Sequence, residues 1–195
     1  MITIVSGLPR SGTSMIMQML EKGGMEILTD NIRKADESNP RGYYEFEKAK
    51  SLRSDCSWLV GADGKAIKII AQLLRFLPAD YCYAIIFIER DMQEILLSQQ
   101  HMLATIGQES STDPDLLMQT FSRQLESAKA WVAGNDNMRS CNVSYHDLIQ
   151  HPAAGADRIN DFLADKLDAR KMAAAVDQTL YRQRLQPIEK ENLNG

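Results

Sequence analysis

Glycine, arginine and hydroxyl residues gathered in one short loop, residues 7–14, indicate a site for phosphate. A β-branched run, residues 2–5, precedes the loop, and an apolar helical pattern begins after Ser14. The first N–H groups of a helix have no intrahelical acceptor and carry about half a positive charge. A strand, a loop and a helix in this order therefore favour the binding of an anionic group.

The spacing of the loop argues against ordinary ATP chemistry. Gly7 and Gly12 are spaced as in the nucleotide-hydrolase loop G-x-x-x-x-G-K-[ST], but Thr13 stands where that loop has lysine. The missing lysine normally reaches the terminal phosphates. Arg10 instead places a cation inside the loop, so we expect the loop to hold an anion and direct one charge at the reacting centre. A plain turn between a strand and a helix is the alternative.

A second pair of candidate residues follows the clearest strand of the chain, residues 83–88. Arg90 stands just after this strand, and Ser98 lies eight positions further, in an amphipathic helical stretch. In open α/β sheets, ligands bind beyond the carboxyl ends of the strands. Arginine offers planar, paired donors to a phosphate dianion, and serine adds one hydroxyl. The alternative for Arg90 is a salt bridge with Asp91 or Glu94.

These two segments resemble the cofactor motifs of the sulfotransferase family, whose members use 3′-phosphoadenosine 5′-phosphosulfate (PAPS). The loop Gly-Leu-Pro-Arg-Ser-Gly-Thr-Ser is similar to the family's 5′-phosphosulfate loop. The resemblance assigns the 5′ end of PAPS to the loop residues Arg10, Ser11, Gly12, Thr13 and Ser14. It assigns the 3′-phosphate to Arg90 and Ser98. The best-known cytosolic members have lysine as the loop cation, whereas many bacterial and Golgi-type members carry other basic residues.

Two further segments continue the resemblance and supply catalytic candidates. Residues 39–45, Asn-Pro-Arg-Gly-Tyr-Tyr-Glu, are similar to a segment of a bacterial branch of the family and make Glu45 a candidate general base. Lys68 interrupts an apolar strand, residues 66–70, where the family often has a lysine near the sulfuryl group. The alternatives are a carboxylate at a helix start for Glu45 and a side chain extending to solvent for Lys68. The predicted catalytic residues are thus Arg10, Lys68 and Glu45.

The alternation of strands and helices predicts a three-layer α/β fold of the P-loop type. We expect about five parallel strands, including a short one at residues 25–28, with helices on both faces. Helices are expected at residues 13–22 and 48–59, and another is capped by Asp113 with Pro114 at its first position. Residues 1–195 are expected to form a single domain with a polar tail from residue 179. The family's basic C-terminal loop has no match here; Arg182 or Arg184 would have to substitute.

Composition limits the classes of partner that this protein is expected to bind. The net charge of −4 argues against a general nucleic-acid or anionic-membrane binder. No apolar run approaches a membrane span, and the start of the chain enters a strand rather than a signal peptide. Three widely spaced cysteines are expected to be reduced and buried. We therefore expect a cytoplasmic protein that binds neither nucleic acid nor membrane.

The resemblance implies transfer of a sulfuryl group from PAPS, as co-substrate and without a metal, to a hydroxyl or amine. The acceptor is expected to be a small molecule, a glycan or a peptide, bound by the loops at residues 30–44 and 108–113. A P-loop nucleotide kinase and a nucleotide-binding module without turnover are the alternatives. Magnesium-dependent ATP binding would favour the first, and tight binding of the product nucleotide without transfer would favour the second.

Overall fold

The computed structural model describes residues 1–30, 32–36, 39–105, 107–108 and 112–181. In these residues, parallel strands form one sheet in the order β2-β1-β3-β4. The strands are β1 (Ile2–Gly7), β2 (Ala66–Lys68), β3 (Tyr83–Glu89) and β4 (Met138–Ser144). The first strand of the chain therefore lies inside the sheet, between β2 and β3, and the α/β architecture expected from the sequence is confirmed.

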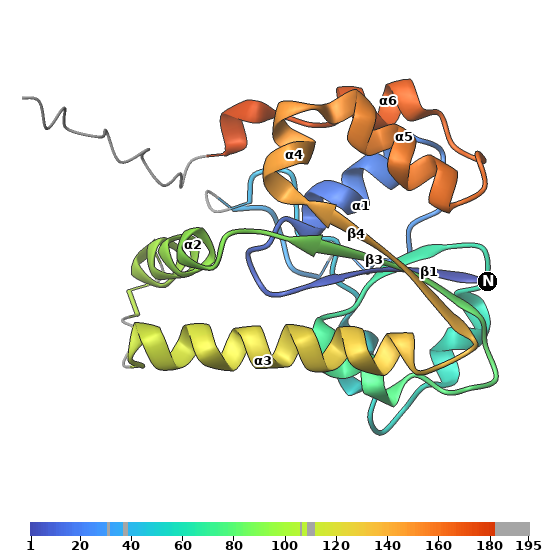
Figure 1. The fold of residues 1–195 in the computed structure, drawn as a ribbon, viewed down its shortest axis with the longest axis horizontal. Helices are drawn as coiled ribbons and strands as arrows, with labels where there is room; N and C mark the ends of the chain where they lie inside the picture. Colours follow the sequence, from blue (N-terminus) through green and yellow to red (C-terminus); the bar gives the residue numbers. More distant parts are fainter. Residues whose placement is uncertain (31, 37–38, 106, 109–111, 182–195) are drawn as a thin grey trace, which may run out of the picture.

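Helices cover both faces of the sheet (Figure 1). The α-helices are α1 (Thr13–Lys22), α2 (Met92–Thr105), α3 (Pro114–Ala133), α4 (Tyr145–Gln150), α5 (Pro152–Phe162) and α6 (Ala169–Ala174). Short 3₁₀ turns are η1 (Glu47–Ser51), η2 (Ser57–Gly61), η3 (Ala71–Phe76) and η4 (Gln178–Leu180). Helices α1, α4, α5 and α6 lie on one face, and α3 lies on the other. None of the described helices is long and apolar enough to cross a membrane.

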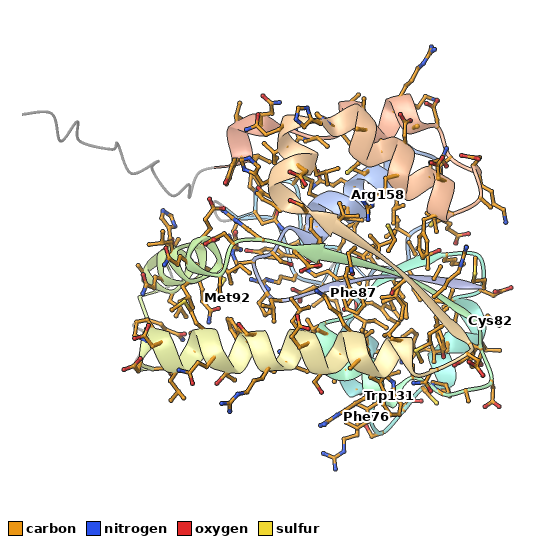
Figure 2. The ribbon with its side chains drawn as sticks, in the orientation of Figure 1. Phe76, Cys82, Phe87, Met92, Trp131 and Arg158 are labelled. Atoms are coloured by element: carbon orange, nitrogen blue, oxygen red, sulfur yellow. The ribbon has the colours of Figure 1, made fainter. Side chains whose placement is uncertain are left out.

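Alternate residues of the central strands supply the two halves of the core. On β1, Ile4 packs with the α3 side and Val5 with the α1 side; on β3, Phe87 and Ile86 divide in the same way. Figure 2 shows Phe87 between the sheet and α3. Because successive side chains of a strand point to opposite faces, a strand covered on both faces is expected to be largely apolar. The apolar runs in the sequence reflect this burial.

The expected strand count is wrong by one, because residues 25–28 do not join the ladder. Ile27 makes a single parallel bridge with Ala66, supported by the bond from the Leu28 N–H to the Ala66 carbonyl. The next residues then bond elsewhere: the Thr29 hydroxyl and the Asp30 N–H both donate to the carbonyl of Glu45. The chain thus leaves the sheet after one pair to hold the loop that follows.

The helix expected at residues 48–59 is also replaced, by the two 3₁₀ turns η1 and η2. Asp55 explains the interruption, because its carboxylate accepts from the Ser57 N–H and its carbonyl accepts from the Trp58 indole. Such local bonds compete with the helical pattern. The cysteines are free, as expected, but Cys56 and Cys82 are exposed rather than buried.

Two predicted helix boundaries are confirmed. Helix α1 covers the expected residues and stops at Gly23, and Asp113 caps α3 by accepting from the N–H groups of Asp115 and Leu116.

The carboxyl edge of the sheet is where the fold bears on function. Strands β2, β1 and β3 are adjacent there. Lys68 ends β2, Arg10 follows β1 and Arg90 follows β3. Three cations distant in sequence therefore reach one edge.

Candidate functional site

The loop between β1 and α1 has a backbone suited to an anion. Arg10 and Gly12 have φ angles of 69° and 106°, in the left-handed region that only glycine adopts without strain. Helix α1 begins directly after Gly12 and has no acidic residue in its first turn and, among the described residues, no side-chain cap. Its first N–H groups therefore keep their capacity to bind an anion.

Ser11 differs from the other loop residues because it points into the protein. It is only 1% exposed, and its hydroxyl has no hydrogen-bond partner among the described residues. A buried hydroxyl without a partner costs free energy, and such groups are commonly satisfied by water or a ligand. Ser11 thus supports the shape of the loop, and its hydroxyl remains an unmet hydrogen bond beneath it.

Replacing Gly12 by alanine is expected to destabilise the protein by roughly 2–4 kcal/mol, from backbone strain and a steric clash. A Cβ at this position would lie 2.5 Å from Cδ2 of the Tyr145 ring. Gly64→Ala is the matched control, because Gly64 also has a positive φ but no described atom within 4 Å of its added Cβ. Urea unfolding of both variants measures the difference, and equal losses would show that Tyr145 does not confine the loop.

Arg10 and Ser98 are in direct contact. The Arg10 Nε–H donates to the Ser98 Oγ over 2.9 Å, and Ser98 is 2% exposed. The resemblance had assigned these residues to opposite ends of PAPS, so their contact brings the loop and α2 together. Burial lowers the pKa of the Arg10 guanidinium, Tyr43 raises it, and the neighbouring cations Arg90 and Arg33 lower it. This gathering of cations favours an anionic ligand.

Lys68 ends β2 with its ammonium group at the same place. Its Nζ donates to the carbonyl of Tyr43 over 3.0 Å and lies 3.9 Å from a carboxylate oxygen of Glu45. The side chain is 13% exposed. Burial lowers the pKa of Lys68 to about 8, an effect that Glu45 opposes and nearby cations reinforce. Lys68 therefore changes its charge near pH 8 unless a further anion binds beside it.

Glu45 sits among three cations. Its carboxylate is 2.8 Å from Arg33, 3.5 Å from Lys50 and 3.9 Å from Lys68. The predicted helix start at this residue is absent, since η1 begins at Glu47. Glu45 therefore links the side chains of Arg33 and Lys50 to Lys68 at the end of β2, and it lines the cavity.

Arg90 is held by a cluster that the sequence did not reveal in full. Its Nε–H donates to Glu94 over 3.0 Å, the salt bridge considered as the alternative, and its Nη1 donates to the carbonyl of Arg10 over 3.3 Å. The guanidinium also lies over two aromatic rings, 4.6 Å from the centroid of Tyr145 and 5.4 Å from that of Tyr181. Arg90 thus has a fixed place at the end of β3.

One cavity of about 610 Å³ collects the predicted residues. Its lining includes all of them except Ser11, namely Arg10, Gly12, Thr13, Ser14, Glu45, Lys68, Arg90 and Ser98. The cavity opens at the carboxyl edge of β1, β2 and β3, where the direction of strand connection reverses between β1 and β3. This is the position where open α/β sheets bind ligands.

The loop before Glu45 is bonded directly to the first turn of α1, next to the loop between β1 and α1. The Asn39 amide donates to the Ser14 hydroxyl over 3.1 Å, and this hydroxyl donates to the Tyr43 carbonyl over 3.2 Å. The same carbonyl accepts from Lys68. Arg33 lies 3.4 Å from the centroid of the Tyr43 ring. Residues on the expected acceptor side and the cofactor side therefore share hydrogen bonds.

Sequence reasoning missed Arg33, Asn39 and Tyr181 as site residues. The first two lie in the polar loop that was expected to meet the acceptor. The sequence therefore indicated the loop, but not the residues that these two side chains contact. Nothing in the sequence indicated Tyr181, since it stands in the polar stretch after α6. Arg182, Arg184 and part of the loop at residues 108–113 fall outside the described residues. Among those described, no group of three His, Cys, Asp or Glu side chains is placed to hold a metal ion.

No protein-family model matches the sequence, and neither does any curated protein. The structure is similar to the sulfotransferase domain from the curacin biosynthetic pathway, with a TM-score of 0.54 and 13% identity over 97% of this chain and 93% of that chain. A sugar kinase from a Janibacter species, in an unliganded structure, gives a TM-score of 0.45 and 17% identity over 90% of this chain and 97% of that chain. The similarity to the sulfotransferase domain concerns the fold.

Proposed function

We propose that this protein transfers a sulfuryl group from PAPS to a hydroxyl or amine acceptor. The observation that carries the proposal is the convergence of Arg10, Lys68 and Arg90 on one cavity beside the phosphate loop. These cations come from the ends of three adjacent parallel strands. The similarity of the two sequence motifs to those of sulfotransferases supports the same function.

The charge and size of the cavity suit PAPS, which carries a phosphosulfate and a separate 3′-phosphate. Among the described residues, six lining side chains are cationic: Arg10, Arg33, Arg41, Lys50, Lys68 and Arg90. Two are carboxylates, Glu45 and Asp177. The volume of about 610 Å³ falls within the usual range of about 300–1,000 Å³ for small-molecule sites. An acidic protein thus contains a locally basic pocket.

In the proposed reaction the acceptor oxygen or nitrogen attacks sulfur, and the bond from sulfur to the bridging phosphate oxygen breaks. The electron pair of that bond goes to the leaving nucleotide, 3′-phosphoadenosine 5′-phosphate (PAP), and the acceptor loses its proton to a base. Arg10 and Lys68 would stabilise the charge that develops on the phosphate and on the sulfuryl oxygens. Glu45, at the cavity wall beside Lys68, is the proposed base.

A P-loop kinase is disfavoured by two loop residues. Thr13 replaces the lysine that reaches the terminal phosphates of ATP. Ser14 stands where the kinase loop places its magnesium-binding hydroxyl, and this hydroxyl is engaged with Asn39 and Tyr43. A nucleotide-binding module without turnover has the same pocket, so only an assay of transfer separates it from an enzyme.

PAP is expected to bind at micromolar strength or better in the absence of metal, and AMP at least about tenfold more weakly. The two nucleotides differ only in the 3′-phosphate, so their comparison isolates that group. Calorimetric titration with PAP, AMP and ATP with Mg²⁺ makes the measurement. Binding of ATP with Mg²⁺ alone would identify a kinase. Binding of PAP without transfer to a panel of phenols, alcohols and amines would identify a binding module.

A further inference from the structure

Tyr181 reaches the Arg90 site from the far end of the chain. It is 8% exposed, and its hydroxyl donates to Oε1 of Glu94 over 2.5 Å. Glu94 is itself 5% exposed and lies on the first turn of α2. Arg90 lines the main cavity and also a neighbouring one of about 510 Å³, whose wall includes Glu94 and Tyr181. The tyrosine thus contacts Arg90 at the wall of this second cavity.

Glu94 divides its two oxygens between Tyr181 and Arg90. Oε1 accepts from the Tyr181 hydroxyl, while Oε2 accepts from Nε of Arg90. The side chains of this ion pair are only 7% and 6% exposed. A buried ion pair is stable only when its remaining lone pairs and protons find partners. Tyr181 supplies such a partner and keeps the carboxylate from turning both oxygens toward Arg90.

The ring of Tyr181 adds a second constraint. It meets the ring of Tyr145 edge to face, at a centroid distance of 5.3 Å and an angle of 80°, and Arg90 lies over both rings. A guanidinium recognises phosphate through planar, paired donors, so its plane decides which oxygens it reaches. The two rings, Glu94 and the Arg10 carbonyl all constrain that plane.

The segment that carries Tyr181 is anchored independently of Arg90. We call residues 175–181 the C-terminal strap. Arg41 donates to the Ala175 carbonyl over 2.9 Å and to Asp177 over 2.6 Å, and Gln178 donates to the Ile149 carbonyl over 2.9 Å. These bonds hold the strap against the loop before Glu45 and against α4. Tyr181 therefore acts on Arg90 from a fixed support.

We propose that Tyr181 is a positioning residue, which orients Arg90 through Glu94 and through its ring so that the guanidinium binds the 3′-phosphate of the nucleotide. This inference rests on the proposed function, because it concerns how the same site recognises PAPS and PAP. Tyr181 itself performs no chemistry. Its contribution is the discrimination between nucleotides that carry the 3′-phosphate and those that lack it.

The test compares the affinity for PAP with that for AMP in Tyr181→Phe and Tyr181→Ala. Tyr181→Phe keeps the ring and removes the bond to Glu94. Tyr44→Phe is the matched control, because the Tyr44 hydroxyl also donates to a glutamate, Glu21, over 2.9 Å. Tyr44 lies between α1 and α6, where it lines a different cavity with Lys22 and Lys171. If Tyr181→Ala does not fold, Tyr181→Phe still carries the test.

Tyr181→Phe is expected to lower the ratio of PAP affinity to AMP affinity about three- to tenfold, and Tyr181→Ala at least about tenfold. The AMP affinity itself and both affinities of Tyr44→Phe should stay within about twofold of wild type. A purely structural role would lower stability without changing this ratio. In a Glu94→Gln background, Tyr181→Phe is expected to lower the ratio of PAP affinity to AMP affinity less than in wild type, because the two residues act as a unit.

The outcomes separate this inference from the proposed function. A wild-type protein that does not prefer PAP over AMP would overturn both. A wild-type protein that prefers PAP, with the preference unchanged in both Tyr181 variants, would retain the proposed function and reject the role of Tyr181. An equal change in the Tyr44→Phe control would also reject it, since the effect would not depend on Arg90.

Discussion

Replacement of Arg90 by alanine is expected to weaken PAP binding about thirtyfold or more and to destabilise the free protein by roughly 3 kcal/mol or more. The loss of binding follows from the loss of a planar cation at the end of β3. The loss of stability follows from Glu94, whose buried carboxylate would lose its ion pair with Arg90. Calorimetry with PAP and urea unfolding of the same variant measure the two effects.

The two effects of Arg90→Ala can be separated with a double variant. Adding Glu94→Gln removes the buried negative charge that has lost its ion pair with Arg90, so the free energy of unfolding should recover while PAP binding stays weak. Arg90→Lys tests geometry, because lysine keeps the charge but lacks the paired donors. Full PAP affinity in the folded double variant would contradict the assignment of Arg90 to the 3′-phosphate.

The affinity for PAP is expected to fall about tenfold between pH 7 and pH 9 because of Lys68. Burial lowers the pKa of this lysine to about 8, so the free protein loses the charge as the pH rises through 8. A bound phosphate keeps the ammonium protonated, and binding above pH 8 must therefore take up a proton. Below pH 8 the lysine is charged in both states. The second pKa of a phosphate monoester, near 6, contributes little in this range.

Calorimetry in two buffers of different ionisation enthalpy measures the proton uptake directly. Lys68→Arg is the control, because arginine stays charged throughout, and its affinity should not change between pH 7 and pH 9. Unfolding does not explain the loss of PAP affinity at high pH. The pKa of Lys68 is lower in the folded protein than its unfolded value of 10.5, so its contribution to stability rises between pH 8 and pH 10.5. A flat pH profile in wild type would exclude Lys68 from the phosphate site.

The sequence predicted best those features that depend on neighbouring residues. The strands β1 and β3, the loop between β1 and α1, and the cap of α3 all follow from local patterns of burial, glycine and capping residues. The position of Arg90 after a strong strand likewise placed it at the carboxyl edge of the sheet. That edge became a single site because parallel strands end together there.

The features that were missed depend on contacts between distant segments. Residues 25–28 have the composition of a strand but bond to the loop at Glu45 after one bridge. The hydrogen bond that Ser98 accepts from Arg10 was not predicted, since side-chain partners depend on how α2 packs; the assignment of Ser98 to the 3′-phosphate stays a prediction. Tyr181 meets Glu94 across 87 positions of sequence, a pairing that no local pattern encodes.

Under the proposed function, the hydrogen bonds that Ser14 and Lys68 share with residues 39–43 would make the binding of nucleotide and acceptor depend on each other. A nucleotide that draws Lys68 or Ser14 toward its phosphates alters the bonds that hold the carbonyl of Tyr43 and the amide of Asn39. An acceptor bound against that loop does the reverse. Linkage requires that each ligand change the affinity for the other by the same factor. Under the proposed function, a few bonds between two loops would therefore carry the coupling between nucleotide and acceptor.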